Sequence, residues 1–436
     1  MKNKANGYAG IDTGLDIEEG GRGKMSLRSL RNLRTFTALK NPVYRIFYGG
    51  LICNMAPQNM QMLVRSLLIY QLTGSAAILG LMSLANSLPM LFLSLWGGVM
   101  ADRVQKKNII IAGQAASAIV SLGVALSLTL GYLSAEREGS WWILMVASVL
   151  QGTSWGIMQP ARQAIIREIV SEEDLMNAVS LNTMGMNVLR LLAPALAGFL
   201  IAAFDFQAVF YLMTVLFCAA IVFISFLPRT GMISLRGRGA LADIKEGFQY
   251  IRRETHIMVT LAFTLFAVIL SMPYMMMLPV FTEDILKVGP AGMGILMSTS
   301  GIGAIAGSLV LASLPNKKRG LLLLVSCLFM GIALVAFASS SSWTLSLIFI
   351  VFVGLGQTGR MTLANTLLQY YSTDEYRGRV MSIYMMEFGL TSFGTFAAGL
   401  MAESIGVQWA IGGFAVTLII ISILALFFLP RLRRLD

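Results

Sequence analysis

The chain has 436 residues, of which 56% are hydrophobic and 13% are charged. An ordinary soluble domain has about 45–50% apolar and about 25% charged residues, so water is not the solvent of most of this chain. The mean hydropathy of +0.73 is what about 12 membrane spans of about 20 residues each would give. The composition argues against a secreted, disordered or nucleic-acid-binding protein, and the net charge of +11 needs another explanation.

The chain has few of the cysteine and histidine residues on which metal binding and nucleophilic catalysis often depend. The cysteines, Cys53, Cys218 and Cys327, lie far apart in apolar runs, and the one histidine is His256. No CxxC or other metal-ligand spacing is present, and an odd number of scattered cysteines does not favour a disulfide framework. We therefore expect no metal site, no cofactor and no enzyme activity.

The N-terminal segment 1–42 is predicted to lie outside the membrane. Its first 24 residues are polar and glycine-rich, which is typical of a disordered tail. From Leu27 to Leu39, apolar residues recur at every third position with three arginines between them. This stretch is either a short basic helix on an anionic membrane surface or a solvated basic tail, and it is too short to decide between them.

Apolar stretches of membrane-spanning length fill most of the remaining chain. Six lie in residues 43–228, at 43–71, 77–100, 109–132, 141–160, 180–203 and 208–228. Six more lie in residues 257–430, at 257–281, 291–314, 321–340, 343–366, 380–403 and 408–429. A basic insert of residues 229–256 separates the two halves, and residues 431–436 form a C-terminal tail. The sequence therefore predicts an all-α membrane protein with twelve transmembrane helices in two six-helix domains.

The basic residues are distributed very unevenly between the predicted loops. Of the 33 Lys and Arg residues, 28 fall in the two tails, the insert and alternate loops, whereas only Arg137 and Lys287 fall in the other loops. By the positive-inside rule, both termini face the cytoplasm in a multi-pass protein of the cytoplasmic or inner membrane. The net charge is then explained by anionic membrane lipid, and no nucleic-acid partner is needed.

An internal repeat relates the two halves. With an offset of 201 residues, segment 161–199 aligns with 362–400 and places Val179 on Val380, Ala197 on Ala398 and Gly198 on Gly399. Each copy contains a span, a short charged turn and the next span. This pattern is typical of parallel repeats in a two-domain transporter.

The loop after the second stretch reads GGVMADRVQKK, with Gly98, Asp102, Arg103, Lys106 and Lys107. It resembles the cytoplasmic signature of the major facilitator superfamily. The resemblance implies that these residues form a cytoplasmic gate, in which the acid faces the N-terminus of span eleven. Where the superfamily usually has glycine, this chain has glutamine, which predicts a less tight turn.

Three further stretches carry a closer resemblance. MQPARQAIIREIVSEEDLMNAVSLN, LMSTSGIGAIAGSLVLASL and LLQYYSTDEYRGRVMS resemble the bacterial branch that contains enterobactin exporters and macrolide efflux proteins. The segment RLLAPALAG resembles a worn antiporter signature in which alanines replace glycines. GLGQTG at residues 354–359, together with Gly303 and Gly307, is predicted to be helix-packing glycine rather than a dinucleotide site.

Four ionisable residues fall inside predicted spans: Arg65, Arg190, Arg360 and Glu387. Each needs a cavity, a partner or an escape to the interface, since a charge at the bilayer centre costs about 2.5–3.5 kcal/mol. Arg65 lies near the end of a span, so its side chain can extend to the membrane–water interface. Arg190 lies deepest in its span and is too far from either end to do so. Arg360 and Glu387 either form a permanent ion pair or take part in proton coupling.

The resemblance also predicts a central cavity lined by spans one, four, seven and ten. Its candidate residues are mostly polar and uncharged, with Arg65 added: Asn54, Gln58, Gln61, Arg65, Gln151, Trp155, Gln159, Tyr274, Gln357 and Asn365. Aromatic and methionine side chains adapt to varied amphiphiles, and this chain has 28 methionines.

Together these features predict a monomeric secondary transporter that works by alternating access. We expect it to export a small amphiphilic substrate, such as a drug or a siderophore, in exchange for protons. The alternative is an importer or a lysophospholipid flippase of the same fold.

Overall fold

The computed structural model describes residues 38–228, 240–315 and 317–435, and these form helices without a strand. The N-terminal tail up to residue 37 and residues 229–239 of the predicted linker lie outside the described residues. The first group of helices comprises α2 (Pro42–Thr73), α3 (Ala76–Arg103), α4 (Lys106–Thr129), α5 (Trp142–Ile169) and α6 (Glu172–Ser225). The second group comprises α7 (Ala240–Arg253), α8 (Thr255–Ser271), α9 (Pro273–Val280), the π-helical turn η2 (Phe281–Ile285), α10 (Gly289–Ser313), α11 (Arg319–Ala338), α12 (Trp343–Tyr371), α13 (Asp374–Ile405), α14 (Val407–Phe428) and α15 (Pro430–Arg433).

Local sequence signals explain where α2 begins and ends. The Asn41 side chain accepts hydrogen bonds from the backbone amides of the first helical turn, and Pro42 occupies a position where no amide is needed. At the other end, Gly74 adopts a left-handed conformation with φ of 63°. Ser75 then caps α3 by accepting from the amide of Ile78 at 3.2 Å.

The long helix α6 is broken at Asp205, which has φ of 72° and ψ of 171°. A non-glycine residue in this region of backbone space costs about 1–3 kcal/mol. Its side-chain Oδ1 accepts a hydrogen bond from the amide of Phe206 at 2.6 Å. The break between α13 and α14 falls at Gly406, which has φ of 91°. The two breaks are separated by the same offset of 201 residues that relates the halves in sequence.

Eight helical stretches in the described residues are long and apolar enough to cross a membrane. Helices α2, α5 and α13 are not among them because they carry more amide and charged side chains, and α6 is one stretch although it is broken at Asp205. The all-helical membrane fold is therefore established, whereas the count of twelve spans stays a prediction.

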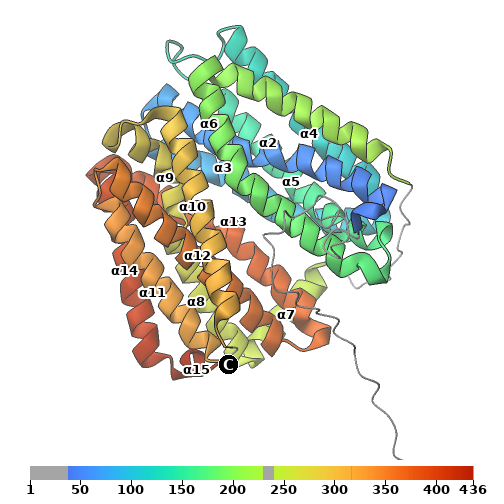
Figure 1. The fold of residues 1–436 in the computed structure, drawn as a ribbon, viewed down its shortest axis with the longest axis vertical. Helices are drawn as coiled ribbons and strands as arrows, with labels where there is room; N and C mark the ends of the chain where they lie inside the picture. Colours follow the sequence, from blue (N-terminus) through green and yellow to red (C-terminus); the bar gives the residue numbers. More distant parts are fainter. Residues whose placement is uncertain (1–37, 229–239, 316, 436) are drawn as a thin grey trace, which may run out of the picture.

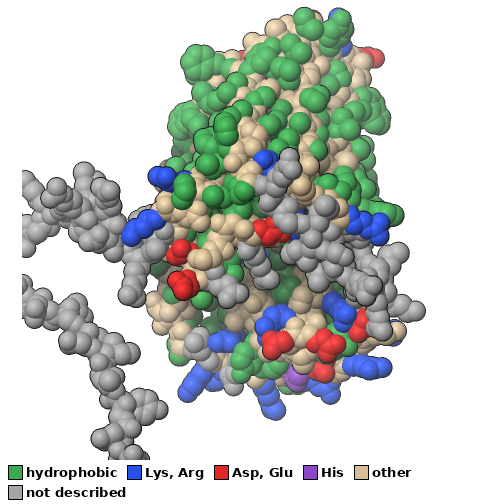
Figure 2. Space-filling model, turned by 90° about the vertical axis from the view of Figure 1, so that its right-hand side faces the viewer, with side chains coloured by type: hydrophobic (Ala, Val, Ile, Leu, Met, Phe, Trp, Pro, Cys, Tyr) green, Lys and Arg blue, Asp and Glu red, His purple; other side chains and the backbone are tan. Residues whose placement is uncertain are grey.

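The helices form two groups that meet at one end of the molecule (Figure 1). We call the helix ends near residues 74, 131, 205, 285, 340 and 406 the sealed end. We call the opposite ends, near residues 41, 104, 171, 254, 318, 372 and 430, the basic end. Figure 2 shows hydrophobic side chains over the upper part of one face, with charged side chains gathered on its lower part.

Glycines permit two close crossings between the groups near the sealed end. A methyl group added to Gly399 of α13 would lie 2.5 Å from the carbonyl oxygen of Ala76 in α3. One added to Gly294 of α10 would lie 2.7 Å from the carbonyl oxygen of Pro194 in α6. Gly198, the repeat partner of Gly399, likewise faces the backbone of α10 at Pro290. The backbones therefore touch at both crossings.

The described part of the linker is held against the second group. Tyr250 of α7 stacks on Tyr376 of α13 with ring centroids 4.3 Å apart. Glu246 of α7 pairs with Arg379 of α13 at 3.1 Å. The linker helix is thus fixed to the first turns of α13 at the basic end.

Candidate functional site: a central cavity with buried polar side chains

A cavity of about 260 Å³ lies between α2, α3, α5 and α9. Its lining combines amides, sulfur, one arginine and one aromatic ring: Gln58, Gln61, Met62, Arg65, Met82, Asn86, Met90, Gln151, Trp155 and Met276. Five of the residues predicted from the sequence are thus brought together around one space. That they bind a substrate stays a prediction.

Several polar atoms of this lining are buried without a hydrogen-bond partner in the described part of the chain. They include the Nε of Arg65, both amide atoms of Gln58 and the Oε1 of Gln151. The Nε2 of Gln151 donates to the hydroxyl of Ser117 at 3.1 Å, which fixes the orientation of that amide. Arg65 is only 6% exposed. The expectation that Arg65 reaches the membrane interface is therefore wrong, because this side chain lines the cavity.

A second cavity of about 410 Å³ lies between α6, α10 and α12. It contains Arg190 and Asn365, and the Arg190 side chain is exposed within it. This cavity explains how Arg190 can lie deep inside a predicted membrane span. Asn365 accepts a hydrogen bond from Gln369, one turn farther along α12.

The other predicted cavity residues lie elsewhere. Tyr274 donates to the Oε1 of Gln357 at 3.3 Å, so these two form a buried pair inside the second group. Asn54 is fully buried, and its Oδ1 accepts from the Nη1 of Arg162 at 3.0 Å. Gln159 is partly buried and its Oε1 has no partner among the described residues.

Sequence reasoning missed Arg162 because it assigned this residue to the loop after the fourth span. Helix α5 continues to Ile169, so Arg162 lies inside it with 6% of its surface exposed. Its guanidinium lies 5.4 Å from the centroid of the Trp155 ring. The signal was the helical period, since Trp155 and Arg162 are seven residues, or about two turns, apart.

Glu387 and Arg360 lie in the interior of the second group. The hydroxyl of Thr264 in α8 donates to the Oε1 of Glu387 in α13 at 2.8 Å. Arg360 of α12 is fully buried, and no ion pair within 4.0 Å joins it to Glu387 in the described residues. The two side chains therefore form no direct ion pair in this conformation, and a structural pairing between them stays a prediction. Proton coupling at Glu387 stays a prediction.

The lysines of the predicted gate motif bind within the first group of helices. Lys106 pairs with Glu168 of α5 at 2.6 Å. Lys107 donates to the carbonyl oxygens of Ser225 and Leu227 at 2.6 Å each, where α6 ends and its carbonyls lack helical partners. Arg103 is exposed. The surroundings of Gly98 and the side chain of Asp102 lie outside what the structure describes, so the gate role stays a prediction.

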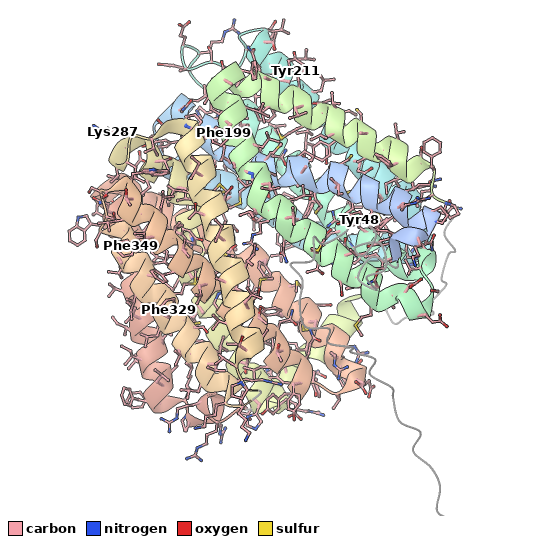
Figure 3. All side chains as sticks on the ribbon, in the orientation of Figure 1. Tyr48, Phe199, Tyr211, Lys287, Phe329 and Phe349 are labelled. Carbon is pink, nitrogen blue, oxygen red and sulfur yellow. The ribbon has the colours of Figure 1, made fainter. Side chains whose placement is uncertain are left out.

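Carboxylates join the two groups at the sealed end. Tyr70 of α2 donates to Asp284 at 2.5 Å, and Gln71 donates to Glu283 at 3.1 Å. Glu403 of α13 accepts from the hydroxyl of Ser75 at 3.0 Å and from the amide of Ala77 at 3.2 Å. Glu403 thus caps α3 from the other group of helices. Tyr211 and Lys287 also lie at this end of the molecule (Figure 3).

Replacing Glu403 should loosen the sealed end. Glu403→Ala removes two cross-group hydrogen bonds at a helix N-terminus, which are worth about 1 kcal/mol together, or about a fivefold change in population. In a cysteine-free background, a Met62→Cys side chain in the cavity should then react about fivefold faster with a membrane-impermeant thiol reagent applied at the sealed end.

Glu138→Ala is the matched control because Glu138 is an exposed loop residue at the same end. It should leave the labelling rate of Met62→Cys unchanged. An equal rate in wild type and Glu403→Ala would show that the Glu403 contacts do not hold this end closed.

The fold, the two groups of helices and the internal cavities define a multi-pass membrane transporter of the major facilitator type. The profile of the transmembrane secretion effector family matches residues 33–436, and the chain belongs to this family of the major facilitator superfamily. It is therefore a transporter and not an enzyme. The resemblance seen in the sequence motifs is thereby confirmed.

Several curated relatives match most of the chain at low identity. The staphyloferrin A transporter of Staphylococcus aureus is 24% identical and covers 82% of this chain and 89% of its own length. The enterobactin exporter of Shigella flexneri is 26% identical, with 88% and 89% covered. Macrolide efflux protein A of Streptococcus pyogenes is 23% identical, with 90% and 97% covered.

Solved transporter structures share the fold. A bacterial homolog of the human lysosomal transporter Spinster, solved in an inward-facing and unoccupied conformation, has a TM-score of 0.70 at 15% identity. It covers 90% of this chain and 97% of its own. A D-xylose–proton symporter has a TM-score of 0.71 at 13% identity, with 91% and 99% covered. At such identities the likeness establishes the fold alone.

Proposed function

We propose that the protein exports small amphiphilic compounds across the cytoplasmic membrane by alternating access. The observation that carries the proposal is the central cavity, whose buried amides, arginine, indole ring and methionines lie beneath the sealed end. Such a lining offers both hydrogen bonds and adaptable apolar contact. The two groups of helices touch through backbone at glycines, through apolar side chains and through a few hydrogen bonds, which are contacts that can be broken and remade.

The orientation in this proposal follows from the charges. The basic end faces the cytoplasm, with both termini there, and the chain crosses the membrane twelve times. In this orientation the described conformation is closed to the outside. Outward transport of the substrate is supported by relatives that are named as an exporter and as an efflux protein. Import or lipid flipping remains the alternative.

Proton antiport is the proposed source of energy, with the protein acting as a monomer. Glu387 is the buried carboxylate that supports this part of the proposal, since it is only 4% exposed and has one oxygen without a partner in the described residues. A group in such a place can hold a proton in one conformation and release it in another when a cation approaches. Arg360 and Arg190 are the candidate cations.

Transport in everted membrane vesicles tests direction and coupling together. Vesicles that contain the protein and are acidified inside should take up a transported compound from a panel of macrolides and siderophores. The uptake should stop when a protonophore collapses the pH gradient, and vesicles without the protein serve as the control. Uptake only in right-side-out vesicles would establish import and remove the export proposal.

A further inference from the structure

The charged residues that line the two cavities are all of one sign. In the described lining, the central cavity has Arg65 and the second cavity has Arg190, and neither lining includes an aspartate or a glutamate. The acidic residues at the sealed end, such as Asp284 and Glu403, are engaged in joining the two groups. The space available to a substrate is therefore electropositive.

Arg65 differs from the other buried arginine of the first group. Arg162 has its acceptor in Asn54 at 3.0 Å and lies over the Trp155 ring, so its charge is accommodated by the protein. Arg65 is equally buried, with 6% exposed, but its Nε has no partner in the described residues and borders the cavity. A buried cation without a carboxylate is costly, and a ligand that supplies the counter-charge recovers that cost on binding.

The groups around Arg65 fit one kind of ligand. The unpaired amide of Gln58 offers both a donor and an acceptor, and the unpaired Oε1 of Gln151 offers an acceptor. On other sides the cavity presents the indole of Trp155 and four methionines. An acidic group would bind the guanidinium, hydroxyl or amide groups would bind the glutamines, and an apolar body would contact the ring and the thioethers.

We propose that the substrate class is an amphiphilic anion, whose carboxylate or other delocalised oxyanion binds Arg65. This inference rests on the proposed function and makes it more specific. Arg190, exposed in the second cavity, provides a further positive charge that attracts such anions toward the protein interior. Amphiphilic cations are disfavoured, because no described carboxylate lines either cavity to receive them.

Binding of three matched fluorescent probes to the full-length protein in nanodiscs tests the charge preference. Dansylglycine is an anion, dansylglycinamide is neutral and dansylcadaverine is a cation. Saturable energy transfer from tryptophan to dansyl reports binding. We expect dansylglycine to bind at least about tenfold more tightly than dansylcadaverine, with the amide between them.

Substitutions at Arg65 test whether this residue causes the preference for anionic probes. Arg65→Gln should weaken dansylglycine binding at least about tenfold and abolish the discrimination by charge, whereas Arg65→Lys should remain within about threefold of wild type. Arg137→Gln removes one positive charge from a loop where Arg137 lies over Tyr132, outside both cavities, and should change nothing.

The inference is overturned if dansylcadaverine binds as tightly as dansylglycine, if dansylglycine shows no saturable binding up to about 1 mM, or if Arg65→Gln leaves it unchanged. The wild-type comparison needs no variant, so it stands even if Arg65→Gln fails to fold. Because binding is measured without a gradient, a protein that selects anions but fails to move compounds in vesicles would remove the export proposal and leave this inference intact.

Discussion

A Glu387→Gln protein should still bind its substrate but lose transport driven by a pH gradient. The substitution keeps the size of the side chain and can still accept the hydrogen bond that Thr264 donates to Glu387 at 2.8 Å. What it removes is the capacity to take up and release a proton, which an antiporter needs on each cycle. We expect vesicle uptake to fall to the level of membranes that lack the transporter.

The readout is uptake with an imposed pH gradient, compared with exchange of labelled for unlabelled substrate without one. Glu375→Gln is the matched control, because Glu375 is an exposed residue in the first turn of the same helix. A structural role for Glu387 predicts lost expression instead, restored in part when Arg360 is also neutralised. Normal proton-driven uptake by well-expressed Glu387→Gln would eliminate the coupling role.

A valine at Gly354 should prevent the second group of helices from packing. Gly354 of α12 faces the backbone of α10 at Ser300, and Gly303 of α10 faces the backbone of α12 at Val351. These reciprocal contacts leave no room for a side chain, and the blocking atoms are backbone that cannot turn aside. We expect Gly354→Val to destabilise the fold by about 3 kcal/mol or more, since overpacking in an interior costs about 1–3 kcal/mol even where neighbours can adjust.

Heating the detergent-solubilised protein, followed by size-exclusion chromatography, measures this loss as a lower temperature of aggregation or as absent monodisperse protein. Gly123→Val is the control, because Gly123 also lies inside a long helix but has nothing within 4 Å of the added carbon. It should shift the transition only slightly. Equal behaviour of the two variants would show that the crossing of α10 and α12 tolerates separation.

The positions of the helices, the repeat between the halves and the packing glycines could be predicted from the sequence. Hydropathy located the helices, and the offset between the halves proved to relate the chain breaks at Asp205 and Gly406. The glycines at 303 and 354 were assigned to helix packing, and the structure confirms this assignment. Each of these features is local, since apolar runs and small residues act wherever the helix places them.

The partners of the polar residues could not be predicted, because they depend on the rotation and depth of neighbouring helices. The sequence does not show that both Arg65 and Arg162 are buried, nor that Arg162 meets an acceptor in Asn54 whereas the Nε of Arg65 has none among the described residues. Nor does it show that Glu403 reaches the start of α3, about 330 residues away in the chain. A shift of one helical residue, about 100° of rotation, would change every one of these contacts.

The two crossings near the sealed end are suited to act as pivots between the two groups of helices. Gly399 against Ala76 and Gly198 against Pro290 bring backbone onto backbone, so at these two points no side chain has to pass over another when one helix turns on its neighbour. The glycines of the two contacts are related by the same offset of 201 residues, and a line through the contacts defines an axis of rotation between the two groups. We expect the two groups of helices to tilt about this axis. The helix ends farthest from the axis should then move most, while the backbones at the two crossings stay in van der Waals contact.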